Sequence, residues 1–356
     1  MPGSKQLRVG GYWLASIGAW GDLTWSTRRP GGCYEASWSM DLPPDYRHPA
    51  LERGKKVEVM DGMLPIWTGT LTEPDRSSQA WSLTAEGLCR EAEHYFAFDG
   101  SLNTVSTADT AVDNAITRGL PWIRRDSIAT FALVEGDTTG GLNTVAALLD
   151  AFSDRLSQRW EVDAAGVVTM TADRTTPTWH LTPGVASLGV ADDEYASHVY
   201  GRFQDSGNAG AYTTVVASDA AAAARWGHRE YPADLTPLGP IPASRATSIV
   251  NGILAKGKGR PGYTNGLEVT SYELTNAGGI PADLSAVVAG QVVRAHGMFD
   301  DTQYLSGQPF LDMVLGEVSY TDGNETVSIT PINTAPRTLA AIQEAQMRRA
   351  AKKMSA

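Results

Sequence analysis

The sequence predicts a mainly β protein with an α/β insertion: two antiparallel β-barrels and a small mixed domain between them. Two separate regions alternate apolar and polar residues as half-buried strands do, and the period becomes helical between them. The composition, 42% hydrophobic and 19% charged with 36 Gly and 10 Trp, suits a β-rich protein. At 356 residues the chain is too long for one core, so we expect two or three domains.

The clearest strand pattern lies in residues 54–86, where three alternating runs are separated by Asp61-Gly62 and by Glu73-Pro74-Asp75. The alternating apolar positions are Val57, Val59, Trp67, Gly69, Leu71, Trp81, Leu83 and Ala85. This pattern predicts an antiparallel meander of three strands.

Residues 290–331 repeat the same pattern with a longer excursion after the first strand. Aligning Gly54 with Gly290 and Gly69 with Gly316 brings the two copies nearly into register. We interpret this as a weak internal duplication, two related β modules flanking a middle region. On spacing alone, any two β meanders would align about as well.

Residues 7–40 also alternate, in short runs separated by Gly-rich turns. Together with the first meander they predict one module ending near Arg90, a closed barrel or sandwich because many short strands need covered edges. Four Trp residues in this region are expected in the barrel core rather than on a binding platform. They are Trp13, Trp20, Trp25 and Trp38.

The middle of the chain predicts helices. Residues 108–118 form one helix, with Thr107 as its N-cap and Gly119 after its end, and residues 144–159 form another, with Asn143 as its N-cap. Strands resume after the second helix, which predicts a small α/β domain.

A further helix is expected over 243–256, inside the second module. The predicted organisation is therefore a first barrel module (1–100), the α/β domain (101–182), the second barrel module with its helical insertion (183–336) and a helical tail (337–356).

Motifs for chemistry are nearly absent. The sequence lacks zinc-protease, nucleophile-elbow and dinucleotide fingerprints, and its six His residues are scattered. Cys33 and Cys89 are expected to be small buried residues. The acidic runs Asp192-Asp193-Glu194 and Asp300-Asp301 are cation-site candidates, but solvated loops are the commoner case. The sequence thus predicts no enzyme activity, no cofactor and no dedicated metal site.

The formal charge of −11 and the pI of about 5.0 argue against a surface that coats nucleic acid, yet they allow a channel through which nucleic acid passes without sticking. No apolar run is long enough to cross a bilayer and no signal sequence is recognisable, so synthesis in a cytoplasm is expected.

Several short motifs carry a family resemblance. They are Trp67-Thr68-Gly69-Thr70-Leu71-Thr72-Glu73-Pro74, Ala85-Glu86-Gly87-Leu88, Ala224-Arg225-Trp226-Gly227-His228-Arg229-Glu230 and Val318-Ser319-Tyr320-Thr321-Asp322-Gly323. With them the chain resembles minor tail proteins of long-tailed, siphovirus-type phages of actinobacteria, and more broadly the baseplate hub family, whose members carry two tail-tube-like β-barrels.

The resemblance implies a structural virion protein of the tail tip, made in the host bacterial cytoplasm. It implies a homotrimeric ring that joins the sixfold tail tube to the threefold tip, since three copies with two barrels each present six barrels. The implied partners are the distal tail or tail tube protein, the tape measure protein, other minor tail proteins, and viral DNA that passes through the lumen during genome ejection. The alternative is a carbohydrate-binding or cell-wall-degrading tail protein, which predicts exposed Trp residues around a groove.

If the ring encloses a channel, its lining should be small, polar or acidic, because a basic lining would hold the DNA phosphates. The candidate channel or interface residues alternate with the core positions of the two meanders. They are Glu58, Thr68, Thr70, Thr72, Asp312, Glu317 and Ser319. Alternation alone does not distinguish these roles from ordinary solvent exposure.

Overall fold

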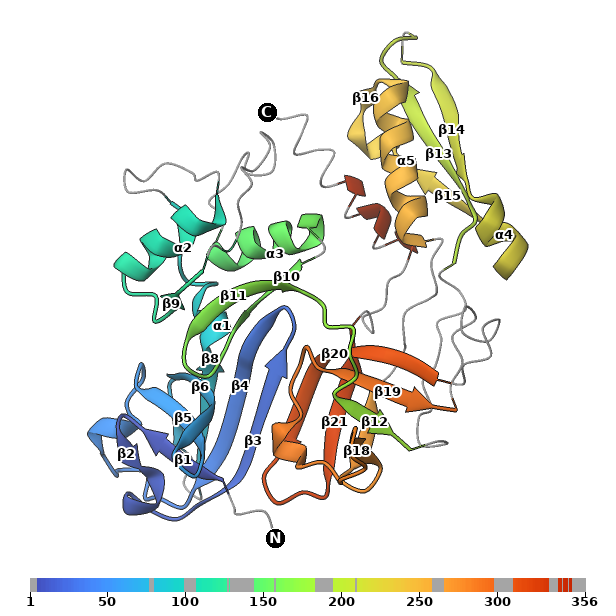
Figure 1. Ribbon diagram of the computed structural model, residues 1–356. Coiled ribbons are helices and arrows are strands. Elements are labelled where there is room, and N and C mark those ends of the chain that lie inside the picture. Colours follow the sequence, from blue (N-terminus) through green and yellow to red (C-terminus); the bar gives the residue numbers. More distant parts are fainter. Residues whose placement is uncertain are drawn as a thin grey trace. The chain divides into compact units, whose positions relative to one another are not determined.

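A computed structural model describes most of the chain and confirms the mainly β fold class (Figure 1). The described residues are 5–76, 80–98, 107–126, 128, 144–156, 158–182, 195–208, 210–257, 266–297, 310–332, 339, 340, 342–344, 346 and 347. None of the helices in these ranges has the length and apolar character that crossing a bilayer requires.

The chain forms two compact units. The first combines residues 1–133, 142–187 and 266–332, and the second combines 134–141, 188–265 and 333–356. Both meanders and the α/β insertion therefore belong to one unit, while most of the insertion before the second meander forms the other.

The first module lies at the N-terminal end of the first unit. Its strands are β1 (Gln6–Val9), β2 (Tyr12–Trp13), β3 (Trp20–Arg28), β4 (Gly31–Met40), β5 (Lys56–Asp61), β6 (Leu64–Leu71), β7 (Asp75–Arg76) and β8 (Trp81–Gly87), with the 3-10 turns Leu14–Ser16 and Pro49–Leu51. They pair antiparallel in the order β2-β1-β5-β6-β8-β4-β3, and β7 extends the edge of β8 beyond β6. Apolar side chains of alternate positions, including Trp67 and Trp81, fill the core. Of the four Trp residues expected there, Trp25 and Trp38 are buried, whereas Trp13 and Trp20 are only half-buried.

The second module uses strands from two parts of the chain. They are β12 (Trp179–Leu181), β17 (Leu267–Thr270), β18 (Leu274–Asn276), β19 (Val292–His296), β20 (Phe310–Thr321) and β21 (Thr326–Pro331), with a 3-10 turn at Leu284–Ala286. Their order is β18-β12-β19-β20-β21-β17. Its last four strands match β5-β6-β8-β4 in order and in direction, whereas β12 runs parallel to β19 where β1 runs antiparallel to β5.

Backbone hydrogen bonds identify equivalent residues in the two modules. The Gly54 N–H donates to the carbonyl of Leu71 and the Gly290 N–H donates to that of Leu315, both over 2.8 Å, and both glycines have φ of +85°. The expected equivalence of Gly54 and Gly290 therefore agrees with the backbone pairing.

The second expected equivalence, of Gly69 with Gly316, is wrong. Val57 pairs with Gly69 and the equivalent Val293 pairs with Met313, so Gly69 corresponds to Met313. Gly316 lies instead at a register shift between Leu315 and Glu317. A bulge adds one residue to one strand and so displaces any alignment based on residue spacing.

The two modules share one continuous sheet. Strand β3 pairs antiparallel with β20, from Thr24 opposite Thr321 to Arg28 opposite Glu317. The edge of the first module that ends in β3 thus continues directly into the second module.

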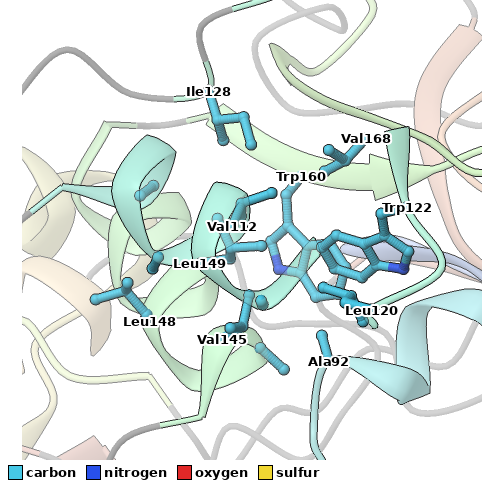
Figure 2. Close-up of a cluster of buried hydrophobic side chains, with 14 of the residues drawn as sticks. Ala92, Val112, Leu120, Trp122, Ile128, Val145, Leu148, Leu149, Trp160 and Val168 are labelled. Carbon is cyan, nitrogen blue, oxygen red and sulfur yellow. The ribbon is translucent and has the colours of Figure 1, made fainter. Parts of the chain in front are cut away.

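The α/β insertion forms a lobe on the first unit. It contains α1 (Leu88–Glu91), α2 (Ala108–Thr117), α3 (Val145–Leu156), β9 (Ile123–Arg124), β10 (Gln158–Val162) and β11 (Val167–Ala172). Its core packs the two helices α2 and α3 against the inner face of the β10–β11 hairpin, around Trp122 and Trp160 (Figure 2). The predicted helices and the Thr107 cap are confirmed, since the Thr107 hydroxyl accepts from the Thr110 N–H. The expected N-cap of α3, Asn143, lies outside the described residues.

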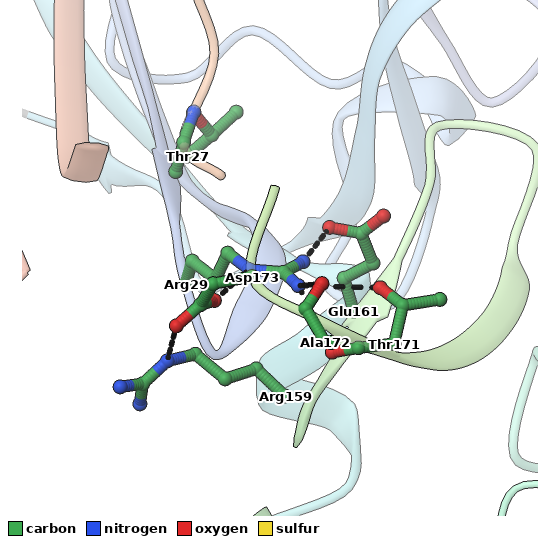
Figure 3. Close-up of polar contacts among 8 residues, drawn as sticks. Thr27, Arg29, Arg159, Glu161, Thr171, Ala172 and Asp173 are labelled. Atoms are coloured by element: carbon green, nitrogen blue, oxygen red, sulfur yellow. Dashed lines mark hydrogen bonds and ion pairs between the residues drawn. The ribbon is translucent and has the colours of Figure 1, made fainter. Parts of the chain in front are cut away.

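Arg29 joins three parts of the first unit. It follows β3, its side chain is only 3% exposed, and it donates to the carboxylates of Glu161 and Asp173 and to the carbonyls of Thr171 and Ala172 in the lobe (Figure 3). On the other side, its side chain lies against Gly290 of the second module, where a Cβ would come within 2.7 Å of Cδ.

The second unit is a sheet covered on one face by helices. It contains β13 (His198–Asp205), β14 (Tyr212–Ser218), β15 (Glu230–Asp234), β16 (Pro240–Ile241), α4 (Ala220–Trp226), α5 (Ala243–Gly257) and a 3-10 turn at Thr236–Leu238. The order is β14-β13-β15, with β16 also pairing with β13. The core lies between the sheet, α5 and the described C-terminal residues Leu339 and Ile342.

Candidate functional site

The surface with the strongest functional indication is one face of the continuous sheet of the first unit. Cross-strand pairs connect Ser328, Ser319, Ser26, Glu35 and Glu86 in one row across β21, β20, β3, β4 and β8. Because directly paired residues project on the same side of a sheet, this row lies on one face that crosses both modules.

Hydroxyl side chains cover that face, and each is half-buried or exposed. They are Thr24, Ser26, Ser37, Ser39, Thr70, Thr72, Ser82, Thr84, Thr270, Ser319, Thr321, Thr326, Ser328 and Thr330. We call this surface the hydroxyl face. The residues between them on the same strands, such as Trp25, Trp38 and Val327, point to the core.

At the β3–β20 junction the hydroxyl face is continuous down to individual side chains. The hydroxyl groups of Thr24 and Thr321 lie 3.0 Å apart, within hydrogen-bonding distance, although 297 positions separate them in the chain.

Cations on the hydroxyl face lie beside carboxylates. Arg90 contacts Glu35 at 3.4 Å and Glu86 at 3.2 Å, and Arg28 stands opposite Glu317. Paired in this way, Arg90 offers little excess positive charge to a polyanion, and Arg28 has a carboxylate as its direct cross-strand neighbour.

Four of the predicted channel residues lie on the hydroxyl face. Thr70 and Thr72 come from β6 and the turn after it, and the Thr72 hydroxyl donates to the Thr84 carbonyl over 2.8 Å. Glu317 and Ser319 come from β20, directly opposite β3. The structure thus brings residues from both meanders together on one surface.

Glu58 and Thr68 are also predicted channel residues, but both side chains are buried within the chain. The lobe covers Thr68, whose hydroxyl donates to the Ala164 carbonyl over 2.7 Å, whereas the carboxylate of Glu58 contacts Arg8 and Lys56 of the first module. Burial acts to raise the pKa of Glu58, yet hydrogen bonds from Arg8 and Lys56 hold that pKa below its ordinary value. A buried side chain cannot line a channel, so we assign both residues a structural role.

Asp312 lies on the outer side of β20, before the bulge. Its carboxylate accepts two hydrogen bonds from Arg294, at 2.7 and 2.8 Å, and the guanidinium of Arg294 lies 3.8 Å from the ring centroid of Phe310. This pair leaves Asp312 with little free charge to offer a partner.

Sequence reasoning from the two meanders missed the contribution of β3, β4 and β8. Their Ser and Thr residues alternate with Trp25, Ala36, Trp38 and Leu83, so the polar side of each strand is visible in the sequence. The pairing of β3 with β20, which joins these strands to the second module, has no local sequence signal.

Alternative sites find less support. Among the described residues, no three His, Cys, Asp or Glu side chains converge as a metal site. Of the four Trp residues considered for an aromatic platform, Trp25 and Trp38 are buried and cannot contact a carbohydrate, while Trp13 and Trp20 are half-buried. The acidic runs 192–194 and 300–301 lie outside the described residues.

Solved structures with a similar fold are tail proteins. The chain is similar to the 43 kDa tail protein of prophage MuSo2 from Shewanella oneidensis, with a TM-score of 0.59 and 13% identity over 92% of this chain and 98% of that one. It is also similar to a tail protein from Neisseria meningitidis MC58 (TM-score 0.53, 14% identity, 92% and 95% covered). A third is the prophage tail protein gp18 from Listeria monocytogenes EGD-e (TM-score 0.54, 10% identity, 98% and 100% covered).

At these identities the likeness shows a common fold, and it extends over nearly the whole of each chain. No protein-family model and no curated protein matches the sequence.

Proposed function

We propose that this chain is a structural hub protein of a phage tail tip, in which three copies form a ring around the channel for DNA and the tape measure protein. The observation that carries the proposal is the hydroxyl face, which continues across two modules that have four strands in the same order and direction. Three copies would present six modules, matching a sixfold tail tube on one side and a threefold tip on the other.

The chemistry of the hydroxyl face suits a channel lining. Ser and Thr side chains are small and uncharged, so they bind phosphates weakly. Arg90 is compensated by Glu35 and Glu86, and Arg28 stands opposite Glu317, so these arginines would add little attraction for DNA. DNA passing through such a channel would release few counterions and would therefore bind the lining only weakly.

The likeness in fold to three tail proteins supports a role in a tail, and the sequence motifs favour a siphovirus-type phage of actinobacteria. In this role the chain contacts the distal tail or tube protein and other minor tail proteins, and it has no catalytic activity of its own.

Charge substitutions on the hydroxyl face test the proposal. Ser37 and Ser319 lie one in each module, and their direct cross-strand partners are all Ser or Thr. The pair Ser37→Lys and Ser319→Lys should slow DNA release from purified particles at low salt, and added salt should restore the rate because counterion release weakens as salt rises.

The matched control places Glu at the same two positions, which changes side-chain size similarly without attracting phosphates. We expect normal DNA release from the Glu particles. Equal release rates for the Lys, Glu and unmodified particles at low salt, with normal assembly of all three, would remove the hydroxyl face from the channel.

A further inference from the structure

The second unit has an open sheet edge at β14. Strand β14 pairs with β13 along its whole length from Tyr212 to Ser218, without a register shift. Its other edge has no partner strand among the described residues, and it is the longest strand there with one edge entirely unpaired. Such an edge is a template for a further strand.

Nothing in β14 protects that edge. Proteins usually block exposed edges with Pro, charged side chains or bulges. The sequence Tyr212-Thr213-Thr214-Val215-Val216-Ala217-Ser218 contains none of these. The opposite edge strand β15 contrasts with it, since Pro232 lacks an N–H and stands between Glu230 and Asp234.

The direction of the free backbone groups follows from two hydrogen bonds. The Asp205 N–H donates to the Ala211 carbonyl and the Asp219 N–H donates to the Ser197 carbonyl, each over 2.9 Å. Odd-numbered residues of β14 therefore direct their backbone groups toward β13. Those of Tyr212, Thr214, Val216 and Ser218 point away from the sheet.

The adjoining sheet face is also uncovered in the described chain. Helix α5 and the C-terminal residues cover one face only, and on the other Tyr212 and Val216 are 61% and 51% exposed. Strand β13 pairs in parallel with β15 and β16. Parallel strands are seldom exposed on one side, so this face favours a partner.

Charge indicates what kind of partner fits. Arg202, paired with Thr214 in register, projects on the uncovered face with its guanidinium 5.0 Å from the ring centroid of Tyr212. Asp234 stands beside it in register on β15, and hydrogen bonds from Thr236 together with the nearby charge of Arg202 lower the pKa of Asp234. Within the described residues no ion pair joins the two, and the guanidinium of Arg202 lies toward Tyr212 on the free edge strand. A second copy pairing through its own β14 would bring no carboxylate to Arg202, because β14 contains none.

We propose that β14 accepts an extended strand from a different tail protein, with an acidic residue of that strand facing Arg202. This inference rests on the proposed function, which supplies neighbouring tail subunits. The added strand would hydrogen-bond the outward groups of β14, the mode by which exposed edges bind extended peptides.

Residue-resolved hydrogen exchange tests the inference on the full chain, alone and in the assembled particle. The amides of Thr214, Val216 and Ser218 should exchange rapidly in the isolated chain and at least about fivefold more slowly in the particle, since one hydrogen bond contributes about 1 kcal/mol. The amides of Thr213, Val215 and Ala217 bond to β13 and should be slow in both samples, which provides an internal control.

A matched pair of variants adds a second readout. Thr214→Pro removes an outward N–H, so it should leave folding nearly intact while Val216 and Ser218 stay rapidly exchanging in the particle. Thr213→Pro removes an N–H that bonds β13 and should destabilise the second unit.

Rapid exchange of Thr214, Val216 and Ser218 in a particle that contains the chain would overturn the inference and leave the proposed function standing. Protection of these amides in the isolated chain that rises with its concentration would identify a second copy as the occupant, which also overturns it. Absence of the chain from the particle would contradict both.

Discussion

Removal of the Arg29 side chain should destabilise the first unit strongly. The guanidinium is 3% exposed, and the two carboxylates it contacts, Glu161 and Asp173, are each 30% exposed. Deleting one partner of a buried ion pair costs about 3–5 kcal/mol. Because both carboxylates reach solvent and can rehydrate, we expect Arg29→Ala to lower the free energy of unfolding by about 3 kcal/mol, at the lower end of that range.

Two comparisons sharpen this prediction. Arg29→Lys keeps the charge but cannot reach both carboxylates and the carbonyls of Thr171 and Ala172 at once, so it should cost about 2 kcal/mol. Arg159 contacts Asp173 as well but is 27% exposed, so Arg159→Ala should cost at most about 1 kcal/mol.

Urea unfolding followed by Trp fluorescence measures these differences. Of the ten Trp residues only Trp226 belongs to the second unit, so the signal reports mainly on the first. Equal midpoints for Arg29→Ala and Arg159→Ala would refute the view that Arg29 joins the two modules and the lobe.

Three further predictions concern single sites of the first unit. Gly69→Ala should lower the free energy of unfolding by about 3 kcal/mol, since a Cβ there would lie 2.2 Å from the Glu86 carbonyl oxygen. A Cβ at Gly54 meets open space, so Gly54→Ala should lower it only by the roughly 1–2 kcal/mol that a positive φ costs, and similar urea midpoints for the two variants would contradict this. Burial, with His296 and Arg294 nearby, lowers the pKa of His180 below 6.5, so the unfolded state binds the proton more readily and the free energy of unfolding decreases as pH falls below about 6.5. His180→Gln should flatten that decrease between pH 7.5 and 5.5, and an unchanged slope in the variant would refute this prediction. Burial raises the pKa of the Cys33 and Cys89 thiols to about 12, so a thiol reagent at pH 8 should label neither residue until urea unfolds the chain. Prompt labelling of the native protein would show that these two thiols are not buried.

Local sequence patterns predicted the strands and helices well because their causes are local. The alternation in β5, β6 and β8 marks which side chains are buried, and Thr107 caps α2 through its own hydroxyl. The duplication was detected for the same reason, since Gly54 and Gly290 share one backbone conformation.

The remaining features depend on contacts between distant residues. The bulge beside Gly316 displaced the second alignment anchor, and no spacing rule reveals it. Thr68 and Thr70 follow the same alternation, yet the turn at Ala164 buries Thr68 while Thr70 stays half-buried. The junction of Thr24 with Thr321 depends on the tertiary fold, so the sequence predicted the polar side of each strand but not the continuous surface they form.

A map of the intact tail tip would show directly whether this chain forms the proposed ring. We expect three copies of the chain in a closed ring, with six similar modules around the channel. The hydroxyl face, marked by Ser26 and Ser319 at the β3–β20 junction, should be turned toward the lumen. A ring of six copies, a single copy, or a ring whose hydroxyl face is turned outward would contradict it.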